Sequence, residues 1–103
     1  MITAMVLFQL ADDATLKDAA AIFRSTAPRY LDKAGLIRKY YIFEPETRKG
    51  GGCYLFENRE VAEASFDDTW RALVLDKYKS EPEIRLFETP VIVDNTTGRI
   101  SGI

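Results

Sequence analysis

A lysine and two tyrosines inside apolar, strand-like segments are the side chains best suited to do chemistry in this sequence. Lys39 and Tyr40 lie in the segment 36–44, and Tyr54 lies in the next such segment. An amine held in a pocket has a lowered pKa and could stabilise a substrate enolate or phenolate, with Tyr40 or Tyr54 as a proton relay. The alternative is that the Lys39 amine extends to solvent at a sheet edge. Arg38 cannot share a site with Lys39, because side chains alternate between the two faces of a strand.

Aromatic side chains are numerous enough to line a pocket for a small hydrophobic or aromatic ligand. Those in the helical segments fall on apolar faces, which places them between helices and sheet. The alternative for each of them is a packed core, which is the more common place for an aromatic side chain. The residues that we expect to contact a substrate are Phe23, Tyr30, Phe56, Phe66, Trp70 and Tyr78.

The absence of histidine restricts the chemistry more than any other feature of the composition. It excludes a Ser-His-Asp triad, a Cys-His pair, a histidine-bound haem and a typical catalytic zinc site. The glycine run 50–52 is no phosphate-binding loop, since no Lys-Ser/Thr pair follows it and it joins two strands; we expect a turn with close backbone approach. We therefore expect a site without metal or cofactor.

Length and charge exclude further classes of protein. The chain has 103 residues, enough for one domain with a hydrophobic core. A net charge of -2 gives no basic surface for a nucleic acid. No segment approaches the roughly 18 apolar residues of a membrane span, so we expect no membrane partner. A lone cysteine, Cys53, fits a reducing compartment, and we expect a cytoplasmic protein.

The hydrophobic pattern predicts the order β, α, β, β, α, β, in which helices cover one face of an antiparallel sheet. This is an α+β fold of the ferredoxin-like type, with one domain over residues 1–94 and a tail, 95–103, that is loose or rests on a neighbour. Pro28 predicts a kink or restart of the first helix near Ser25 to Ala27. The expected elements are a strand 2–10, a helix capped by Thr15 and ended by Gly35, strands 36–44 and 52–57 joined by the loop 45–51, a helix from the cap Asn58 to Phe66, a helical segment from 67–68 to Tyr78, and a strand 84–94 after Pro82.

The strands are apolar on both faces, which predicts a dimer. In the segment 36–44, Tyr40 and Ile42 represent one alternating set, Tyr41 and Phe43 the other, and all four are apolar or aromatic. Helices can cover only one face of the sheet, and the second face would otherwise meet water. We therefore expect a homodimer in which this face meets its own copy.

Three segments carry a resemblance to a known family. They are 35–41, 51–60 and 87–94, and together with the sequence between them they resemble the YdhR-like family, whose members are named as monooxygenases. The resemblance implies a dimeric α+β barrel. It also implies a cofactor-independent monooxygenase for a small aromatic or readily ionised organic substrate, because the best-understood enzymes of this superfamily oxidise aromatic polyketides with molecular oxygen alone. Such a site needs an apolar, aromatic pocket, a base and a group that stabilises an oxyanion.

The sequence departs from the oxidising relatives at one point. Those relatives use polar and aromatic residues on the third strand and the following helix, and the positions that correspond here are Gly52, Phe56 and Ala62, which carry no hydrogen-bonding group. The haem-degrading branch needs a histidine ligand, which this sequence lacks. The alternative function is therefore a non-catalytic dimer that binds a small molecule or serves in assembly.

Overall fold

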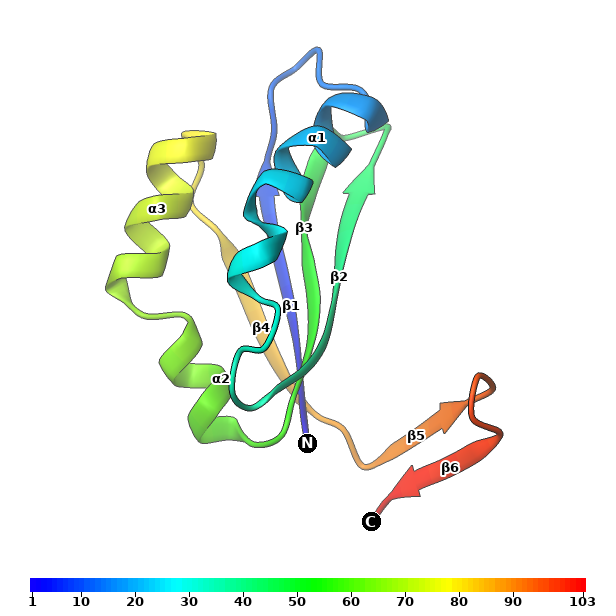
Figure 1. The fold of residues 1–103 in the computed structure, drawn as a ribbon. Helices are drawn as coiled ribbons and strands as arrows, with labels where there is room; N and C mark the ends of the chain where they lie inside the picture. The colour runs from blue at the N-terminus through cyan, green and yellow to red at the C-terminus, as the bar shows by residue number, and fades with distance from the viewer.

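Four antiparallel strands form the central sheet in the computed structural model, which describes residues 1–103 (Figure 1). The strands are β1 (Ile2–Gln9), β2 (Leu36–Glu44), β3 (Lys49–Phe56) and β4 (Glu83–Glu88). Their order across the sheet is β2-β3-β1-β4, so β1 and β3 each pair with two neighbours. This arrangement confirms the predicted ferredoxin-like α+β fold.

The helices all pack against one face of the sheet (Figure 1). Along β1, alternate residues from Ile2 to Phe8 are at most 8% exposed because they lie beneath the helices. The intervening residues of β1 are only half-buried, which is the alternation of a sheet covered on one side. The helices are α1 (Leu16–Thr26), the single 3-10 turn η1 (Ala27–Arg29), α2 (Arg59–Ser65) and α3 (Asp68–Tyr78).

Side-chain caps begin the three α-helices. Thr15 and Asp18 form a capping box at α1, in which each side chain accepts a hydrogen bond from the backbone N–H of the other. Asn58 caps α2 as predicted, and Asp67 caps α3 by accepting from the N–H of Trp70 at 2.8 Å. Because Asp67 begins a new helix after α2 has ended, α2 and α3 are separate helices and cover different parts of the sheet.

The first helix is interrupted near Pro28, as the sequence predicts. α1 ends at Thr26, and the chain continues as the tighter turn η1. The expected end at Gly35 is wrong. Gly35 lies beyond the helix in the turn before β2, where its φ of +80° suits glycine.

The glycine run belongs to a strand and not to the expected loop. Gly50, Gly51 and Gly52 are all part of β3, and the connection to β2 is shorter than predicted. The predicted close approach is correct, because a Cβ on Gly51 would lie 1.8 Å from the carbonyl oxygen of Val6. Glycine is tolerated within a strand where another backbone comes this near.

The C-terminal segment forms a hairpin that stands away from the sheet (Figure 1). The expected single strand 84–94 is wrong, since it divides at Pro90 into β4 and β5 (Val91–Asp94). The tail 95–103 is not loose, because its end forms β6 (Arg99–Gly102), which pairs with β5; that it rests on a neighbour stays a prediction.

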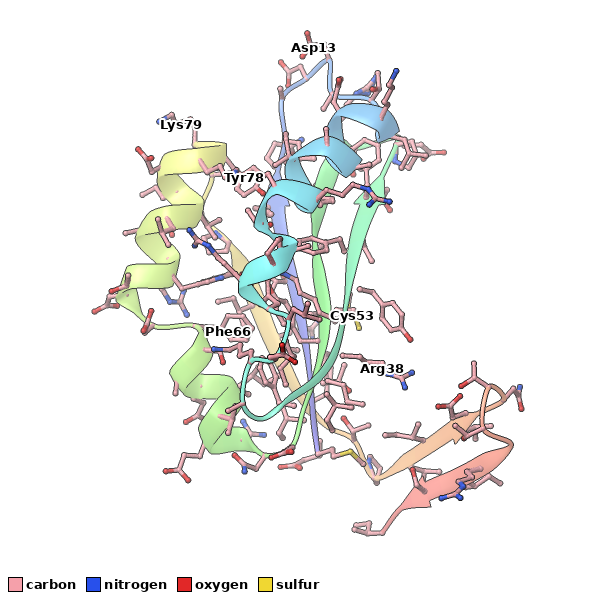
Figure 2. The ribbon with its side chains drawn as sticks, viewed as in Figure 1. Asp13, Arg38, Cys53, Phe66, Tyr78 and Lys79 are labelled. Carbon is pink, nitrogen blue, oxygen red and sulfur yellow. The ribbon has the colours of Figure 1, made fainter.

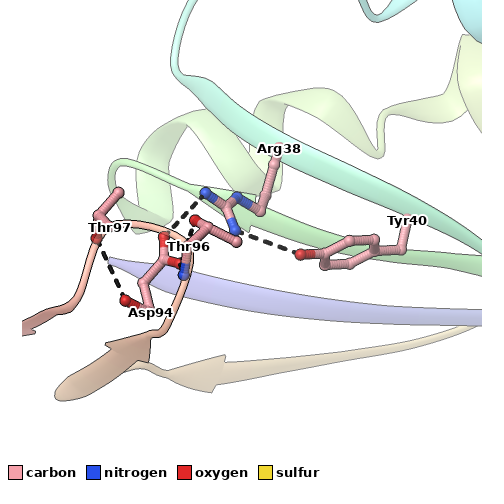
Figure 3. A network of polar contacts seen from close by, with 5 residues as sticks. All are labelled: Arg38, Tyr40, Asp94, Thr96 and Thr97. Carbon is pink, nitrogen blue, oxygen red and sulfur yellow. Dashed lines mark hydrogen bonds and ion pairs between the residues drawn. The ribbon is translucent and has the colours of Figure 1, made fainter.

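One polar network connects this hairpin to the sheet (Figure 3). A guanidinium nitrogen of Arg38 lies 3.5 Å from a carboxylate oxygen of Asp94, and another donates to the Tyr40 hydroxyl at 3.3 Å. Hydrogen bonds from Thr96 to Asp94 lower the pKa of that carboxyl and help to keep it charged.

The helices are too short to be membrane spans. The longest of them, α1 and α3, have 11 residues each, about half of what a bilayer requires.

Candidate functional site

A cavity of about 60 Å³ lies between the helix-covered face of the sheet, the end of α1 with η1, and α3. Most of its walls are apolar or aromatic. Trp70 and Tyr78 reach it from α3, and Tyr78 points toward the space between α1 and the sheet (Figure 2). Such a hollow with a few convergent polar groups is the usual form of a small-molecule site.

Lys39 is the central polar side chain of this cavity. It lies opposite Tyr54 in the pairing of β2 with β3, so the strand register directs both side chains toward the helices. Its Nζ lies 3.4 Å from the ring centroid of Tyr30, 3.8 Å from that of Tyr41 and 4.5 Å from that of Tyr54. The ammonium form would be held by cation–π attraction to three rings.

Neighbouring groups hold the three tyrosine rings in place. The indole Nε1–H of Trp70 donates to the Tyr30 hydroxyl at 3.2 Å. The hydroxyls of Tyr41 and Thr26 share a hydrogen bond of 2.8 Å. Tyr54 is only 3% exposed and packs between other aromatic rings. The cage around Lys39 is therefore built before any ligand enters.

Burial sets the protonation of these groups. It lowers the pKa of the Lys39 ammonium to about 7, because no carboxylate or other acceptor offsets the lost hydration. Burial raises the pKa of Tyr78 to about 12 and also raises the pKa of Tyr54. Near neutral pH the cavity thus holds Tyr54 and Tyr78 in protonated form and an amine that exchanges its proton readily.

The remaining charges at the cavity are positive. Arg29 and Lys77 line it together with Lys39, and none of the lining residues is acidic. Lys77 contacts the Ser25 hydroxyl at 3.4 Å, and neither cation forms an ion pair. A ligand with a negative charge would meet only favourable charges here.

The structure brings five of the predicted site residues together. They are Lys39, Tyr30, Tyr54, Trp70 and Tyr78, and all of them line the cavity. The pocket interpretation of Lys39 is thereby supported over exposure at a sheet edge. The turn η1, which contains Pro28, carries Arg29 and leads to Tyr30 at the cavity wall.

The placement of Tyr40 with Lys39 is wrong. Adjacent strand residues face opposite sides, so Tyr40 lies on the bare face of the sheet, 55% exposed and in contact with Arg38. The same alternation that separated Arg38 from Lys39 also separates Tyr40. It indicates Tyr41 instead, a residue that the sequence argument missed and that the period of two could have found.

Three predicted aromatic residues do not line this cavity. Phe56 and Phe66 are core residues, 0% and 7% exposed, and both pack against the ring of Tyr54. Phe23 stacks on Tyr41 with ring centroids 4.8 Å apart and lines a separate shallow groove beside α1. These residues support the cage from behind and do not face its interior.

The arrangement can bind an anion and move a proton, and it contains no ready metal site. Nowhere do three or more His, Cys, Asp or Glu side chains converge. An amine with a pKa near 7 can accept a proton from a substrate, and the resulting ammonium can then stabilise the anion it leaves behind.

In the comparison with known proteins, the chain matches one protein family. The family described as "Putative mono-oxygenase ydhR" matches residues 6–90, which include most of the sheet, all of the helices and every residue of the cavity. Among curated proteins, no significant match to the chain is found.

Proposed function

The chain belongs to the YdhR mono-oxygenase family, and from this premise we propose that it oxidises a small aromatic or readily ionised organic molecule with molecular oxygen and no cofactor. One observation carries the proposal. The cavity holds the Lys39 amine among three tyrosine rings, and none of its lining residues is a carboxylate. That environment suits a substrate that must become an electron-rich anion before oxygen can react with it.

Near neutral pH the Lys39 side chain is present both as the neutral amine and as the ammonium, and such a reaction needs each form at a different stage. The neutral amine removes a proton from a carbon or hydroxyl of the substrate, and the ammonium stabilises the enolate or phenolate. The anion transfers its electron pair to oxygen, forming a carbon–oxygen bond and a peroxide that takes a proton back. Loss of water from the peroxide leaves a carbonyl, so one oxygen atom enters the product and the other enters water.

The tyrosines orient the substrate and keep water out. Tyr54 stays protonated because burial raises its pKa, so its hydroxyl can donate to a substrate oxygen as a relay. The rings of Tyr30 and Tyr41 offer flat apolar walls to an aromatic substrate.

Oxygen consumption tests the proposal directly. Anthrone and a series of hydroquinones are offered to the metal-free protein, and uptake is followed with an oxygen electrode. We expect uptake above the uncatalysed rate, and we expect Lys39→Met to lose at least tenfold of it while Lys79→Met, a change at an exposed lysine outside the cavity, retains it. No uptake with any of these compounds would refute the catalytic proposal.

A second function, binding without catalysis, is favoured by a specific observation. The positions that correspond to the polar residues of oxidising relatives are Gly52, Phe56 and Ala62, of which Phe56 and Ala62 are 0% exposed. They therefore offer the cavity no hydrogen-bonding group. Anaerobic titration of the same compounds separates the two functions, because binding without oxygen uptake would support a small-molecule-binding domain.

We further propose that the protein acts as a homodimer joined through the helix-free face of the sheet. This face carries half-buried apolar side chains at its centre and Tyr40 and Phe87, 55% and 42% exposed, toward its edges. A sheet face of this composition is costly to expose to water. The residues on it are Thr3, Met5, Leu7, Arg38, Tyr40, Ile42, Cys53, Leu55, Arg85 and Phe87, with the polar or charged Gln9, Glu44, Lys49 and Glu83 at one end.

A further inference from the structure

The Lys39 amine is free to act as a nucleophile. It forms no hydrogen bond or ion pair. Tyr30, Tyr41 and Tyr54 surround it and present the faces of their rings to it. Arg48 Nε is the one fully buried side-chain nitrogen or oxygen without a partner. Lys39 Nζ also has no hydrogen-bond partner, but it is not fully buried. A molecule can therefore reach it.

The surroundings of this amine favour its neutral form. The titratable groups that line the cavity with it are Arg29, Tyr30, Tyr41, Tyr54, Lys77 and Tyr78. Two are cations and none is a carboxylate, so no fixed negative charge holds a proton on Lys39. A desolvated lysine near other cations is the recognised setting for an amine that attacks carbonyl groups.

The two other cations indicate what such a carbonyl compound would carry. Arg29 from η1 and Lys77 from α3 line the same cavity without ion-pair partners. A carboxylate on the ligand could pair with either of them while the carbonyl carbon meets Lys39. A cavity of about 60 Å³ accepts a ligand of a few heavy atoms as it stands, whereas an aromatic substrate would require the surrounding side chains to move.

From this geometry we propose that Lys39 forms an imine with a small oxo acid. The Nζ lone pair attacks the carbonyl carbon and forms the C–N bond. The nitrogen loses both of its protons, and the former carbonyl oxygen leaves as water. The Tyr30 hydroxyl accepts from the Trp70 Nε1–H and also interacts with the Tyr54 hydroxyl, so this pair of tyrosines can relay a proton to the oxygen.

This reactivity is independent of the proposed oxygen chemistry, since imine formation consumes no oxidant. The test is therefore performed without oxygen. The intact protein is incubated with pyruvate and sodium cyanoborohydride near pH 7.5, and peptide mass spectrometry locates the reduced adduct among the six lysines: 17, 33, 39, 49, 77 and 79. Butanone, which has the same heavy-atom skeleton length without a carboxylate, serves as the matched probe.

We expect pyruvate to label Lys39 at least tenfold faster than any other lysine. The physical basis is the neutral fraction, roughly a thousandfold larger for an amine of pKa about 7 than for an ordinary lysine near 10.4. We also expect pyruvate to label Lys39 at least fivefold faster than butanone does. Lys77→Met should reduce this preference, and Lys79→Met, just after the end of the same helix and outside the cavity, should leave it unchanged.

The results that overturn the proposal are equally specific. Labelling spread evenly over the exposed lysines, or absent from Lys39 in the wild-type protein, would exclude an imine-forming amine. Equal labelling by butanone and pyruvate would exclude the oxo acid as the ligand class. Because both measurements use the wild-type chain, a variant that fails to fold cannot obscure the outcome.

Discussion

Gly52 provides the space in which Lys39 lies. A Cβ placed on Gly52 would stand 3.0 Å from Lys39 Cε and 2.8 Å from a ring carbon of Tyr54. The missing side chain on β3 thus lets the lysine of β2 fold down among the rings. Gly52 therefore has a positioning role toward the amine.

Gly52→Ala is expected to displace Lys39 or Tyr54 and to raise the pKa of Lys39 toward its ordinary value as the amine moves to solvent. Overpacking should also cost about 1–3 kcal/mol of unfolding free energy. NMR titration of the lysine side-chain signals and chemical denaturation measure the two effects.

Gly50→Ala is the matched control for this change. A Cβ there would meet Leu10 and Phe23 at 3.0 Å and does not reach Lys39. It should lower stability without changing the pKa of Lys39. Equal pKa changes in both variants would mean that Gly52 has no special relation to the lysine.

Stability is expected to rise with pH between about 7 and about 10. The folded-state pKa of Lys39 is lowered to about 7, whereas the unfolded chain has an ordinary value near 10.4. In this interval the unfolded state binds more protons, so the free energy of unfolding increases with pH. Urea denaturation at pH 6, 7.5 and 9 measures the slope, below the range where tyrosine ionisation acts in the opposite direction.

Lys39→Met should remove that rise. The variant keeps the alkyl packing without the cost of a desolvated charge, so it should be more stable than the wild type at pH 6, and this advantage should be clearly smaller at pH 9. Parallel pH profiles for the two proteins would contradict the burial of the amine.

A charge on the helix-free face should dissociate the proposed dimer. Met5 lies at the centre of this face, and Met5→Arg would place a guanidinium between two apolar sheets. Light scattering at micromolar concentration should give about twice 11.7 kDa for the wild type and 11.7 kDa for the variant. Leu75→Glu, at a 43% exposed position on α3, is the control and should remain dimeric. A wild-type mass of 11.7 kDa would exclude the dimer.

Tyr41 and Tyr40 form a natural pair for testing the cage. Tyr41→Leu removes one wall around Lys39 and should weaken binding of an aromatic ligand by about tenfold, in line with the loss of 1–2 kcal/mol of ring contacts. Tyr40→Leu changes the other face and should leave the same affinity within twofold. Anaerobic calorimetric titration with a hydroquinone compares them, and equal losses would argue against the cavity as the binding site.

The contact between Arg38 and Asp94 should keep the hairpin in place. Arg38→Ala removes the ion pair and the hydrogen bond to Tyr40, so the hairpin should move more freely and trypsin should cleave after Arg99 several times faster. Lys79→Ala, which removes a comparable surface ion pair on α3, should leave the cleavage rate unchanged. Equal rates in all three proteins would show that the network does not restrain the hairpin.

Local patterns in the sequence determined the element types and much of the site. The caps at Thr15 and Asn58, the break at Pro28 and the alternation along β2 are properties of short segments, and they predicted the fold and a lysine among apolar neighbours. The same alternation places Lys39 and Tyr41 on one face of β2, and the grouping of Lys39 with Tyr40 overlooked this.

Tertiary structure decided what depends on partners distant in sequence. Whether Lys39 faces helices or a bare sheet follows from which face α1 and α3 cover, and no residue near Lys39 encodes that choice. Its pKa depends on desolvation by Tyr30 and Tyr54, which reach it from a turn and from another strand. The strand assignment of the glycine run likewise required the close approach of Val6, because glycine alone has little preference for a strand.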